Sequence, residues 1–478
     1  MKTLMLIVFL FSSQSFGEGL SSAEWVKKLK LPDPEIEVLE NGLKLAWFSG
    51  GRVPTLDMAI LFPEGTKNDP DGKSGTHLLL GEAWERSVGT YSHLEFKKKV
   101  ESLGARSYVS ISEDSTTVGI HGLSLDQEIL TNLFSKLVLT PLFKKEEVQK
   151  VKKRTIEGFI HLGDQSSSLV SWVHSRRMDS QSIYGRGSFE SLSEFKKIKS
   201  DEIKEYWKNH YGPRGAVLMI VGKYDKDKIK KQLMKNFSKW KMKKNQKKNT
   251  KKYSDLSIPD LLSDKVLVID HPGDTQVQIR MGLKVPTLKN PDSFSLQVAN
   301  TLIGEMFFSR LNLILRSQKA LTYGARSSFE YHLDSASWNI VTATATEKSS
   351  ETLQTTLDLI KSMNSGEIMD TEIETAKEYL LGSFPLKIAT LNAVAARWLS
   401  SYLYDLGPRF LTHWMTEIQK VNSSRVKKVV KKYLPYQKLK ITISGDGKQI
   451  KSILKKSKFK NSFTVLKFKD NKFIRVKQ

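Results

Sequence analysis

The histidines are the residues whose chemistry would be easiest to recognise in this chain, because two of them about four positions apart on one helix can hold a metal ion. No two of the nine histidines lie within ten residues of each other. They stand at positions 77, 93, 121, 161, 174, 210, 271, 332 and 413. The chain also lacks cysteine, which excludes disulfides and thiolate zinc sites. The sequence therefore contains no helical histidine pair for zinc chemistry.

The elements that would position any site come in two copies. A charged helical segment that ends in an aromatic residue and leads into an alternating strand occurs at residues 199–222 and again at 422–445. The two strands close on Gly222 and Gly445, and a second matching pair, residues 147–159 and 372–384, repeats at nearly the same offset. This period is far too long for a solenoid, so it predicts a duplicated domain.

Hydrophobic periodicity gives the fold class. Strands are expected at residues 35–48, around an Asn-Gly turn, and at 57–62, 106–110, 115–120, 265–270, 275–283, 322–329 and 337–345. Helices are expected at 75–85, 125–139, 293–302 and 350–363. Several strands are neighbours in sequence, which favours α+β over alternating α/β. The pattern predicts duplicated α/β sandwich halves, with mostly antiparallel sheets and helices on one face.

The first residues read as a secretory signal peptide, residues 1–17. Lys2 is followed by the short apolar run 4–11, and Ser15 and Gly17 suit a cleavage site. The run is shorter than the roughly 20 residues that span a bilayer, although a retained anchor is the alternative. We expect an exported chain, periplasmic or extracellular. The two halves are predicted at 34–238 and 262–478, joined by a lysine-rich linker at 239–261.

The formal net charge is +25, from 76 Lys and Arg against 51 Asp and Glu. Such a charge would suit binding to nucleic acid or to an anionic membrane. Binding of this kind predicts an affinity that falls steeply as the salt concentration rises. However, the lysines are spread over the whole chain, and no nucleic-acid motif accompanies them. The distribution favours solvated helix faces, so we expect no nucleic-acid partner and no stable membrane insertion.

The repeat, the element order and several short phrases resemble the pitrilysin/insulinase-like zinc peptidases, particularly the mitochondrial-processing-peptidase type. The phrases are Gly89-Thr90 and residues 100–105, 140–143, 315–323 and 379–385, of which the last two are the most specific. The resemblance covers nearly all of the chain after the signal peptide. It implies a pair of similar α/β domains, and two such pairs that close like a clamshell around an unfolded peptide.

The chain departs from this family where the active members hold zinc. They carry His-x-x-Glu-His on one helix and a distant Glu. On the segment 75–90 the motif would fall at Leu78, Gly81 and Glu82, or at Leu80, Ala83 and Trp84. His77 and Glu82 are five apart, on different sides of a helix, and Glu157, near the distant Glu, has no histidines to join. The resemblance therefore implies no catalytic residue and no metal on this chain alone, with zinc on a partner subunit.

Two residues of the second half match a functional pair of the family. Arg316 and Tyr323 correspond to its Arg-x6-Tyr pair, in which the Tyr donates to the scissile carbonyl region and the Arg holds a substrate carbonyl. The alternative is an ordinary surface Arg and a packed Tyr. Nearby, residues 302–311 match a glycine-rich loop but keep only Gly304; Met306, Phe307 and Phe308 would offer apolar contacts or pack in the core.

Together these features predict a non-catalytic, substrate-binding subunit of a heteromeric zinc metalloendopeptidase. Its partner would be a homologous zinc-bearing peptidase subunit, and its substrates extended peptides held in part by Arg316 and Tyr323. The alternative function is a structural or scaffolding protein that kept the fold without proteolysis. The variants Arg316→Ala and Tyr323→Phe distinguish the two, because only the first function predicts lost activity in the complex.

Overall fold

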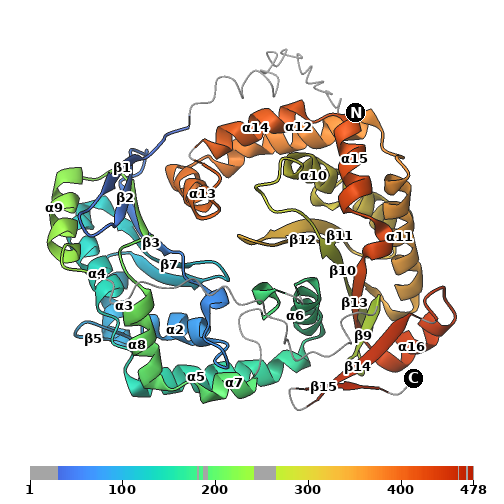
Figure 1. Cartoon of the computed structure of the whole chain (residues 1–478), viewed down its shortest axis with the longest axis horizontal. Helices are drawn as coiled ribbons and strands as arrows, with labels where there is room; N and C mark the ends of the chain where they lie inside the picture. Colours follow the sequence, from blue (N-terminus) through green and yellow to red (C-terminus); the bar gives the residue numbers. More distant parts are fainter. Residues whose placement is uncertain are drawn as a thin grey trace, which may run out of the picture.

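The computed structural model describes residues 31–179, 182–186, 192–241, 265–407, 409–460, 462–469 and 472–476. The predicted signal peptide and most of the predicted linker lie outside these residues, so both stay predictions. The described chain forms two α/β halves that face each other (Figure 1), each built on one large sheet.

The first half contains a six-stranded sheet with the strand order β1-β2-β8-β3-β7-β6. Only β2 and β8 are parallel neighbours. The hairpin expected at 35–48 is present, with Gly42 at φ 89° in its turn. In chain order the strands are β1 (Glu35–Val38), β2 (Lys44–Ser49), β3 (Thr55–Phe62), β6 (Arg106–Ile111), β7 (Thr116–Leu123) and β8 (Val217–Gly222). A two-stranded hairpin, β4 (Ser87–Val88) and β5 (Tyr91–Ser92), lies apart from this sheet.

The second half contains a seven-stranded sheet with the order β11-β12-β10-β13-β9-β14-β15. Here β9 runs parallel to both of its neighbours, and the other pairs are antiparallel. The predicted fold class, with mostly antiparallel sheets, is confirmed. The strands are β9 (Val266–Asp270), β10 (Gln276–Lys284), β11 (Ala325–Tyr331), β12 (Ala336–Ala345), β13 (Lys440–Gly445), β14 (Phe463–Lys469) and β15 (Lys472–Arg475).

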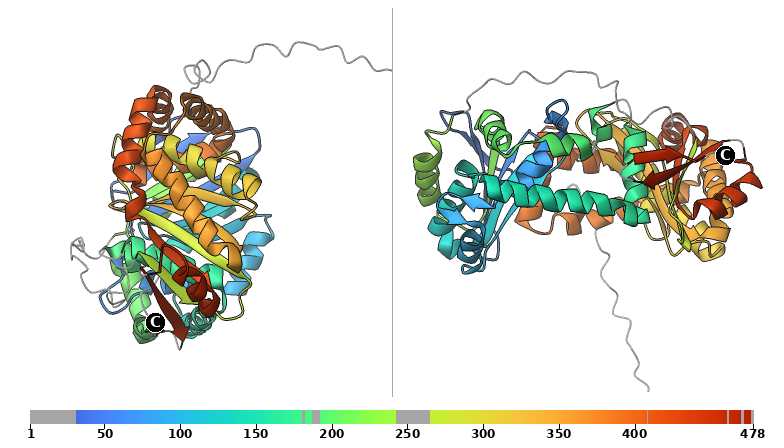
Figure 2. Two further views of the ribbon diagram at one scale, coloured as in Figure 1. Left: turned by 90° about the vertical axis from the view of Figure 1, so that its right-hand side faces the viewer. Right: turned by 90° about the horizontal axis from the view of Figure 1, so that it is seen from below.

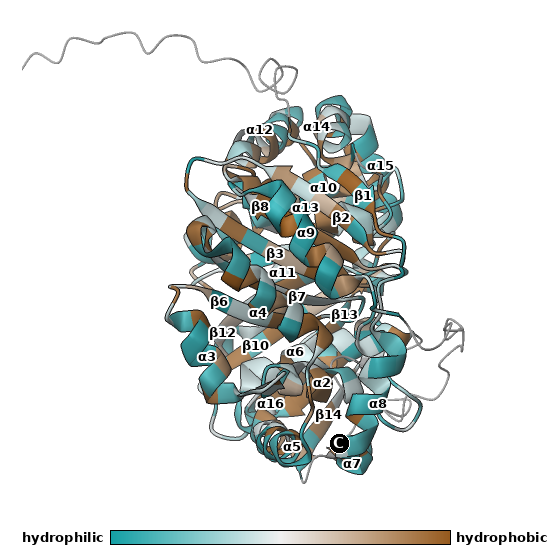
Figure 3. Ribbon diagram, turned by 90° about the vertical axis from the view of Figure 1, so that its left-hand side faces the viewer, coloured by the Kyte–Doolittle hydropathy of each residue, from teal (hydrophilic) through white to brown (hydrophobic). Residues whose placement is uncertain are grey.

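Helices cover the outer face of each sheet, and their buried faces form the two main cores. Figure 3 shows hydrophilic residues on the outer helices of the first half and hydrophobic ones on the strands behind them. The first half has α2 (Thr76–Trp84), α3 (His93–Glu101), α4 (Gln127–Leu139), α5 (Lys145–Ile160), α6 (Ser166–Met178), α7 (Leu192–Lys197), α8 (Ser200–His210) and α9 (Lys226–Phe237).

The second half repeats this helix order, except that the π-helical segments η6 and η7 follow α10 where the first half has the hairpin β4–β5 and α3. Its helices are α10 (Ser293–Asn300), η6 (Thr301–Glu305), η7 (Asn312–Gln318), α11 (Ser349–Asn364), α12 (Asp370–Lys387), α13 (Leu391–Leu403), α14 (Phe410–Lys420), α15 (Ser423–Tyr433) and α16 (Gly447–Lys455). No single described helix is long and apolar enough to cross a membrane; α12 and α13 pass that test only together, as a pair bent by 114°.

The two halves exchange one helix each, which the repeat alone does not predict. The helix α6 follows α5 in the first half but packs on the inner face of the second sheet, where Val170 and Val173 lie in one cluster with Leu267. Figure 2, seen from below, shows α5 running toward the second half. Gly282 on β10 leaves room for α6, since a Cβ there would lie 2.8 Å from Nε2 of His174.

The helix α13, which follows α12 in the second half, makes the reciprocal contact with the first sheet. Trp398 packs edge-to-face on Phe48 with 5.8 Å between ring centroids, and Lys44 Nζ donates to the Tyr402 hydroxyl at 2.9 Å. Each sheet therefore carries its own helices on one face and one helix of the other half on the opposite face. The burial of both exchanged helices ties the halves together.

Cutting the chain between the halves should therefore leave them associated. We expect that a specific protease site placed between residues 242 and 264, once cleaved, gives two fragments that co-elute in size-exclusion chromatography and separate only in denaturant. The reason is that removing either exchanged helix would expose its apolar face to water.

The matched control is the same cut in a Val173→Asp chain, where a charge enters the buried contact of α6 and should release the fragments. Separate elution of the fragments from the otherwise unchanged cut chain would show that the exchanged helices do not hold the halves together.

Candidate functional site

Helix α2, where the active relatives would carry zinc, is built as a core helix. Leu80, Ala83 and Trp84 are completely buried, and Nε1 of Trp84 donates to the Leu137 carbonyl at 2.8 Å. One register of the zinc motif falls on these three residues. Their side chains are apolar or already bonded within the core, so they do not fit a zinc ion.

The other register falls where α2 faces the edge strand β6. A Cβ on Gly81 would lie 2.5 Å from Cδ1 of Ile111, so the isoleucine side chain packs directly against the helix backbone. Glu82 is exposed and forms an ion pair with Arg154 on α5 at 2.7 Å. The positions that would face a metal are therefore filled by a methyl group and an Arg–Glu pair.

His77 and Glu82 do not share a site. The His77 ring is completely buried, and its Nδ1 lies 2.7 Å from Oδ1 of Asp69. Asp69 also accepts from the backbone N–H groups of Gly75 and His77, at the start of α2. This carboxylate at the helix N-terminus gives His77 and Asp69 a structural role.

Glu157 is exposed on α5, and its carboxylate lies 4.0 Å from Nζ of Lys153. Among the residues that the structure describes, no group of three or more His, Asp or Glu side chains is arranged to hold a metal ion. The described residues thus do not suit the zinc site that active members of the family carry.

The residues predicted to act on substrate lie on an exposed aromatic surface of the second half. We use the name aromatic surface for five exposed side chains that lie close together in sequence, Phe307, Phe308, Leu313, Arg316 and Tyr323; contacts join Phe307 to Phe308 and to Arg316. All five side chains are exposed, Tyr323 to 93% and Phe308 to 78%. The Phe307 and Phe308 rings meet edge-to-face at 5.1 Å, and the Arg316 guanidinium lies 5.0 Å from the centroid of Phe307. Phe307 and Phe308 therefore do not pack in the core, which settles the alternative that their sequence left open.

Local backbone structure explains how this surface forms. The loop that carries Phe307 and Phe308 is held between the π-helical segments η6 and η7, a form that is rare and often occurs at functional sites. Gly304 lies one residue before the end of η6, and a Cβ there would lie 2.4 Å from the backbone nitrogen of Ser327 on β11. The one glycine that remains from the family's loop is thus required for packing, while the aromatic residues after it project outward.

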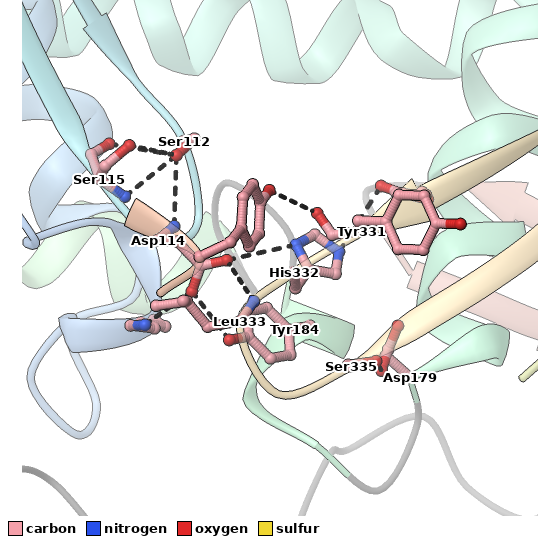
Figure 4. Close-up of polar contacts among 12 residues, drawn as sticks. Ser112, Asp114, Ser115, Asp179, Tyr184, Tyr331, His332, Leu333 and Ser335 are labelled. Atoms are coloured by element: carbon pink, nitrogen blue, oxygen red, sulfur yellow. Dashed lines mark hydrogen bonds and ion pairs between the residues drawn. The ribbon is translucent and has the colours of Figure 1, made fainter. Parts of the chain in front are cut away.

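The inner hairpin tips of the two sheets meet at a polar junction (Figure 4), which the sequence did not reveal. Asp114, between β6 and β7, accepts from the backbone N–H of Leu333, between β11 and β12, at 2.9 Å. It also accepts from the Tyr184 hydroxyl at 2.8 Å and from Lys67 Nζ at 2.6 Å. The Tyr184 ring stacks on His332 at 4.2 Å.

Burial and the charge of Asp114 both raise the pKa of the Tyr184 hydroxyl, which therefore remains a donor to that carboxylate. The junction holds the first half against the second through groups that are all satisfied, so it acts as structural support rather than as a reactive centre. A single Asp among serines in a turn carries no sequence signal that would identify this contact in advance.

Comparisons with known proteins agree with this arrangement. Residues 197–380 match the family described as the peptidase M16 inactive domain. The chain is 22% identical over 408 residues to a protein of Helicobacter pylori named zinc protease PqqE, covering 84% of this chain and 90% of that one. It is 23% identical over 401 residues to a second H. pylori protein, named non-peptidase homolog YmxG, covering 82% and 89%.

Among solved structures, the fold is similar to that of a peptidase M16 inactive domain protein from Pseudomonas fluorescens. The TM-score is 0.76 at 20% identity, and the match covers 87% of this chain and 98% of that one. This likeness concerns the fold alone, and it spans both halves.

Proposed function

Since this chain belongs to the pitrilysin-like peptidase M16 family, as a non-catalytic member, we propose that it is the substrate-binding subunit of a two-chain zinc endopeptidase. The observation that carries the proposal is the exposed pair of Arg316 and Tyr323 on the aromatic surface, in a chain whose own helix α2 offers no zinc ligands. The zinc belongs to the partner, a homologous subunit with an intact His-x-x-Glu-His helix.

The chemistry of the pair suits this role. The Tyr323 hydroxyl can donate a hydrogen bond to the oxygen on which negative charge develops when zinc-bound water attacks a peptide carbonyl. Arg316 carries a fixed charge and several donors that suit the carbonyls of an extended peptide. Because the side chains of both residues are exposed on this chain, a partner surface and a peptide can reach them without rearrangement of the core.

The aromatic surface also explains why a partner is expected. The contacting rings of Phe307 and Phe308 are exposed to water, and exposed apolar patches mark interaction sites. Aromatic residues and Arg are the types enriched in the buried centres of protein interfaces. In the proposed complex, this surface lies at the substrate chamber between the two subunits. We also propose that the protein is exported, with residues 1–17 as its signal peptide.

The proposal is tested by reconstitution with a zinc-bearing subunit from the same genome. We expect that the isolated chain contains less than about 0.1 zinc per molecule and cleaves no peptide, because a His pair is needed for tight binding. The mixture should form a stable complex in size-exclusion chromatography and cleave unfolded peptides faster than the zinc-bearing subunit alone.

Two results would count against the proposal. One tightly held zinc in the isolated chain would show that it has its own centre. A complex that forms but cleaves no faster than the zinc-bearing subunit alone would favour the alternative, a scaffolding role for the same fold.

A further inference from the structure

A pocket of about 400 Å³ opens in the second half, beside the edge strand β11 and apart from the aromatic surface. It is lined by β11, by the end of α10 and η6, and by α12, α13 and α14. Its volume lies within the range of small-molecule and side-chain sites in proteins. All of its lining residues belong to this chain.

The place of the pocket in the repeat is informative. The elements α10–η6, β11 and α12 hold the positions that α2, β6 and α5 hold in the first half. In the first half, the space between these elements is closed by Ile111 against Gly81 and by the pair of Glu82 and Arg154. The same space in the second half is open.

Aromatic rings form two rigid walls of the pocket. Phe329 and Tyr331 on β11 stack with their centroids 5.4 Å apart. Phe384 on α12 and Trp414 on α14 stack at 5.1 Å, and Nε1 of Trp414 donates to the Gln297 side chain at 2.6 Å. Rings that are held by stacking and hydrogen bonding lose little freedom when a ligand binds, and flat apolar walls select flat apolar groups.

One polar group inside the pocket has no partner among the described residues. The Tyr331 hydroxyl is buried and makes no hydrogen bond with the described residues. Its ring points away from the junction around Asp114 (Figure 4). Burial, together with the nearby Glu305, raises the pKa of this hydroxyl, so it remains a donor at neutral pH. Buried donors are almost always paired, and an unpaired one in a cavity marks a position for an acceptor.

The pocket also contains one carboxylate, Glu305, and two cations, Lys387 and Arg397. Glu305 accepts from Thr301 and Asn300, and the Asn300 oxygen accepts from Ser327 and Trp338. Lys387 and Arg397 line the pocket as well; Nε of Arg397 donates to the Lys387 carbonyl at 3.1 Å, which leaves the rest of its guanidinium for an anion.

We propose that this pocket binds a group that combines an aromatic ring with a carboxylate, the ring between the two stacked walls and the carboxylate on Arg397 and Lys387. The Tyr331 hydroxyl donates to an acceptor on the same ligand. Two sources carry this chemistry: an aromatic residue of a peptide with an acidic neighbour, and a free aromatic acid. The site lies entirely within this chain, so it stands whether or not the zinc-bearing partner is found.

The test uses the isolated full chain and three probes in titration calorimetry or ligand-observed NMR. N-acetylphenylalanine carries ring and carboxylate, its amide carries the ring alone, and acetyl-Gly-Phe-Glu-Gly-amide represents a peptide source. We expect saturable binding below about 10 mM, and the acid to bind at least about fivefold more tightly than the amide, because the carboxylate gains charge-assisted hydrogen bonds.

Variants of the lining residues test which residue binds which part of the ligand. In Arg397→Gln the preference for acid over amide should fall to about one, and Tyr331→Phe should weaken both probes about threefold, through the lost hydroxyl alone. Arg425→Gln and Tyr379→Phe are matched controls outside the pocket and should leave both affinities unchanged. If Arg397→Gln proves unstable on heating, the exposed Lys387→Gln serves in its place.

Each outcome decides something. Tighter binding of the peptide than of the acid assigns the site to peptides, and the reverse order assigns it to free aromatic acids. The proposal is overturned if no probe saturates, if acid and amide bind equally to the unchanged chain, or if the control variants weaken binding as much as the pocket variants do.

Discussion

The Tyr323→Phe variant is expected to lower kcat of the reconstituted peptidase by about a hundredfold, the usual cost of removing one donor to a developing oxyanion. The KM should change little, because this hydrogen bond strengthens only as charge develops in the transition state. The side chain is 93% exposed, so loss of its hydroxyl disturbs no packing in the isolated chain. Steady-state kinetics on the complex, with assembly checked by size-exclusion chromatography, measure both parameters.

The companion variant Arg316→Ala is expected to behave differently. Arg316 would hold the peptide before and during reaction, so its loss should raise KM by about tenfold as well as lower kcat. Phe307→Ala should reproduce part of this increase, because the Phe307 ring orients the guanidinium at 5.0 Å. Tyr379→Phe, on a half-exposed helix position of the same half, is the matched control and should change neither parameter.

An unchanged kcat for Tyr323→Phe in an intact complex would contradict the proposal that this chain completes the active site of its zinc-bearing partner. The aromatic surface would then remain as an assembly surface, and the scaffolding function would become the better explanation. Loss of assembly in the Phe307→Ala and Phe308→Ala variants, with normal kcat in whatever complex remains, would support that explanation directly.

The sequence predicted the local elements of this fold well, because their signals are local. The Asn-Gly turn at Gly42 and the alternation around it specify a hairpin, and the strand of β8 is apolar throughout because both of its faces are covered. The repeat also identified equivalent elements, such as α5 and α12, because duplicated segments keep their spacing.

The exchanged helices could not be predicted in the same way. Periodicity shows that α6 and α13 each have an apolar side, but it does not show which sheet receives that side. The contacts of His174 with Thr442 and Asn339 join residues far apart in sequence, and so does the packing of Trp398 on Phe48. A sequence without an alignment holds no record of such pairs.

The site was only partly predictable for a related reason. The motif match placed Arg316 and Tyr323 on the second half, yet the exposure of Phe307 and Phe308 depends on the π-helical turns around them. The pocket beside β11 was missed because its residues come from six separate elements, and no local motif joins them. In the structure, the open volume of about 400 Å³ and the unpaired Tyr331 hydroxyl distinguish the cavity from packing.

His174 on the exchanged helix α6 contributes a pH-dependent part of the free energy of unfolding. His174 is buried between the halves, with Nδ1 2.9 Å from the Thr442 hydroxyl and Nε2 3.2 Å from the Asn339 side chain. Burial, and then the charges of Arg177, Arg280 and Lys440, lower the pKa of His174 to about 3. The ordinary value near 6.5 applies to the unfolded chain.

The sign of the effect follows from these two values. Above pH 6.5 the imidazole is neutral in both states, and its buried contacts contribute fully to stability. As the pH falls from 6.5 toward 3, the unfolded chain takes up a proton that the folded chain does not, so the free energy of unfolding decreases. At pH 5 the loss attributable to His174 is about 2 kcal/mol, since one pKa unit corresponds to about 1.4 kcal/mol.

We therefore expect the free energy of unfolding of the His174→Gln variant to change less between pH 7 and pH 5 than that of the unchanged chain, by about 2 kcal/mol. Urea unfolding at the two pH values measures the difference, and any constant loss of packing in the variant cancels from it. His161→Gln removes an exposed histidine paired with Asp164 and should keep the original pH dependence. If His174→Gln kept it too, the imidazole would already be charged in the folded chain, and the buried contact of α6 would owe its stability to the apolar residues on either side.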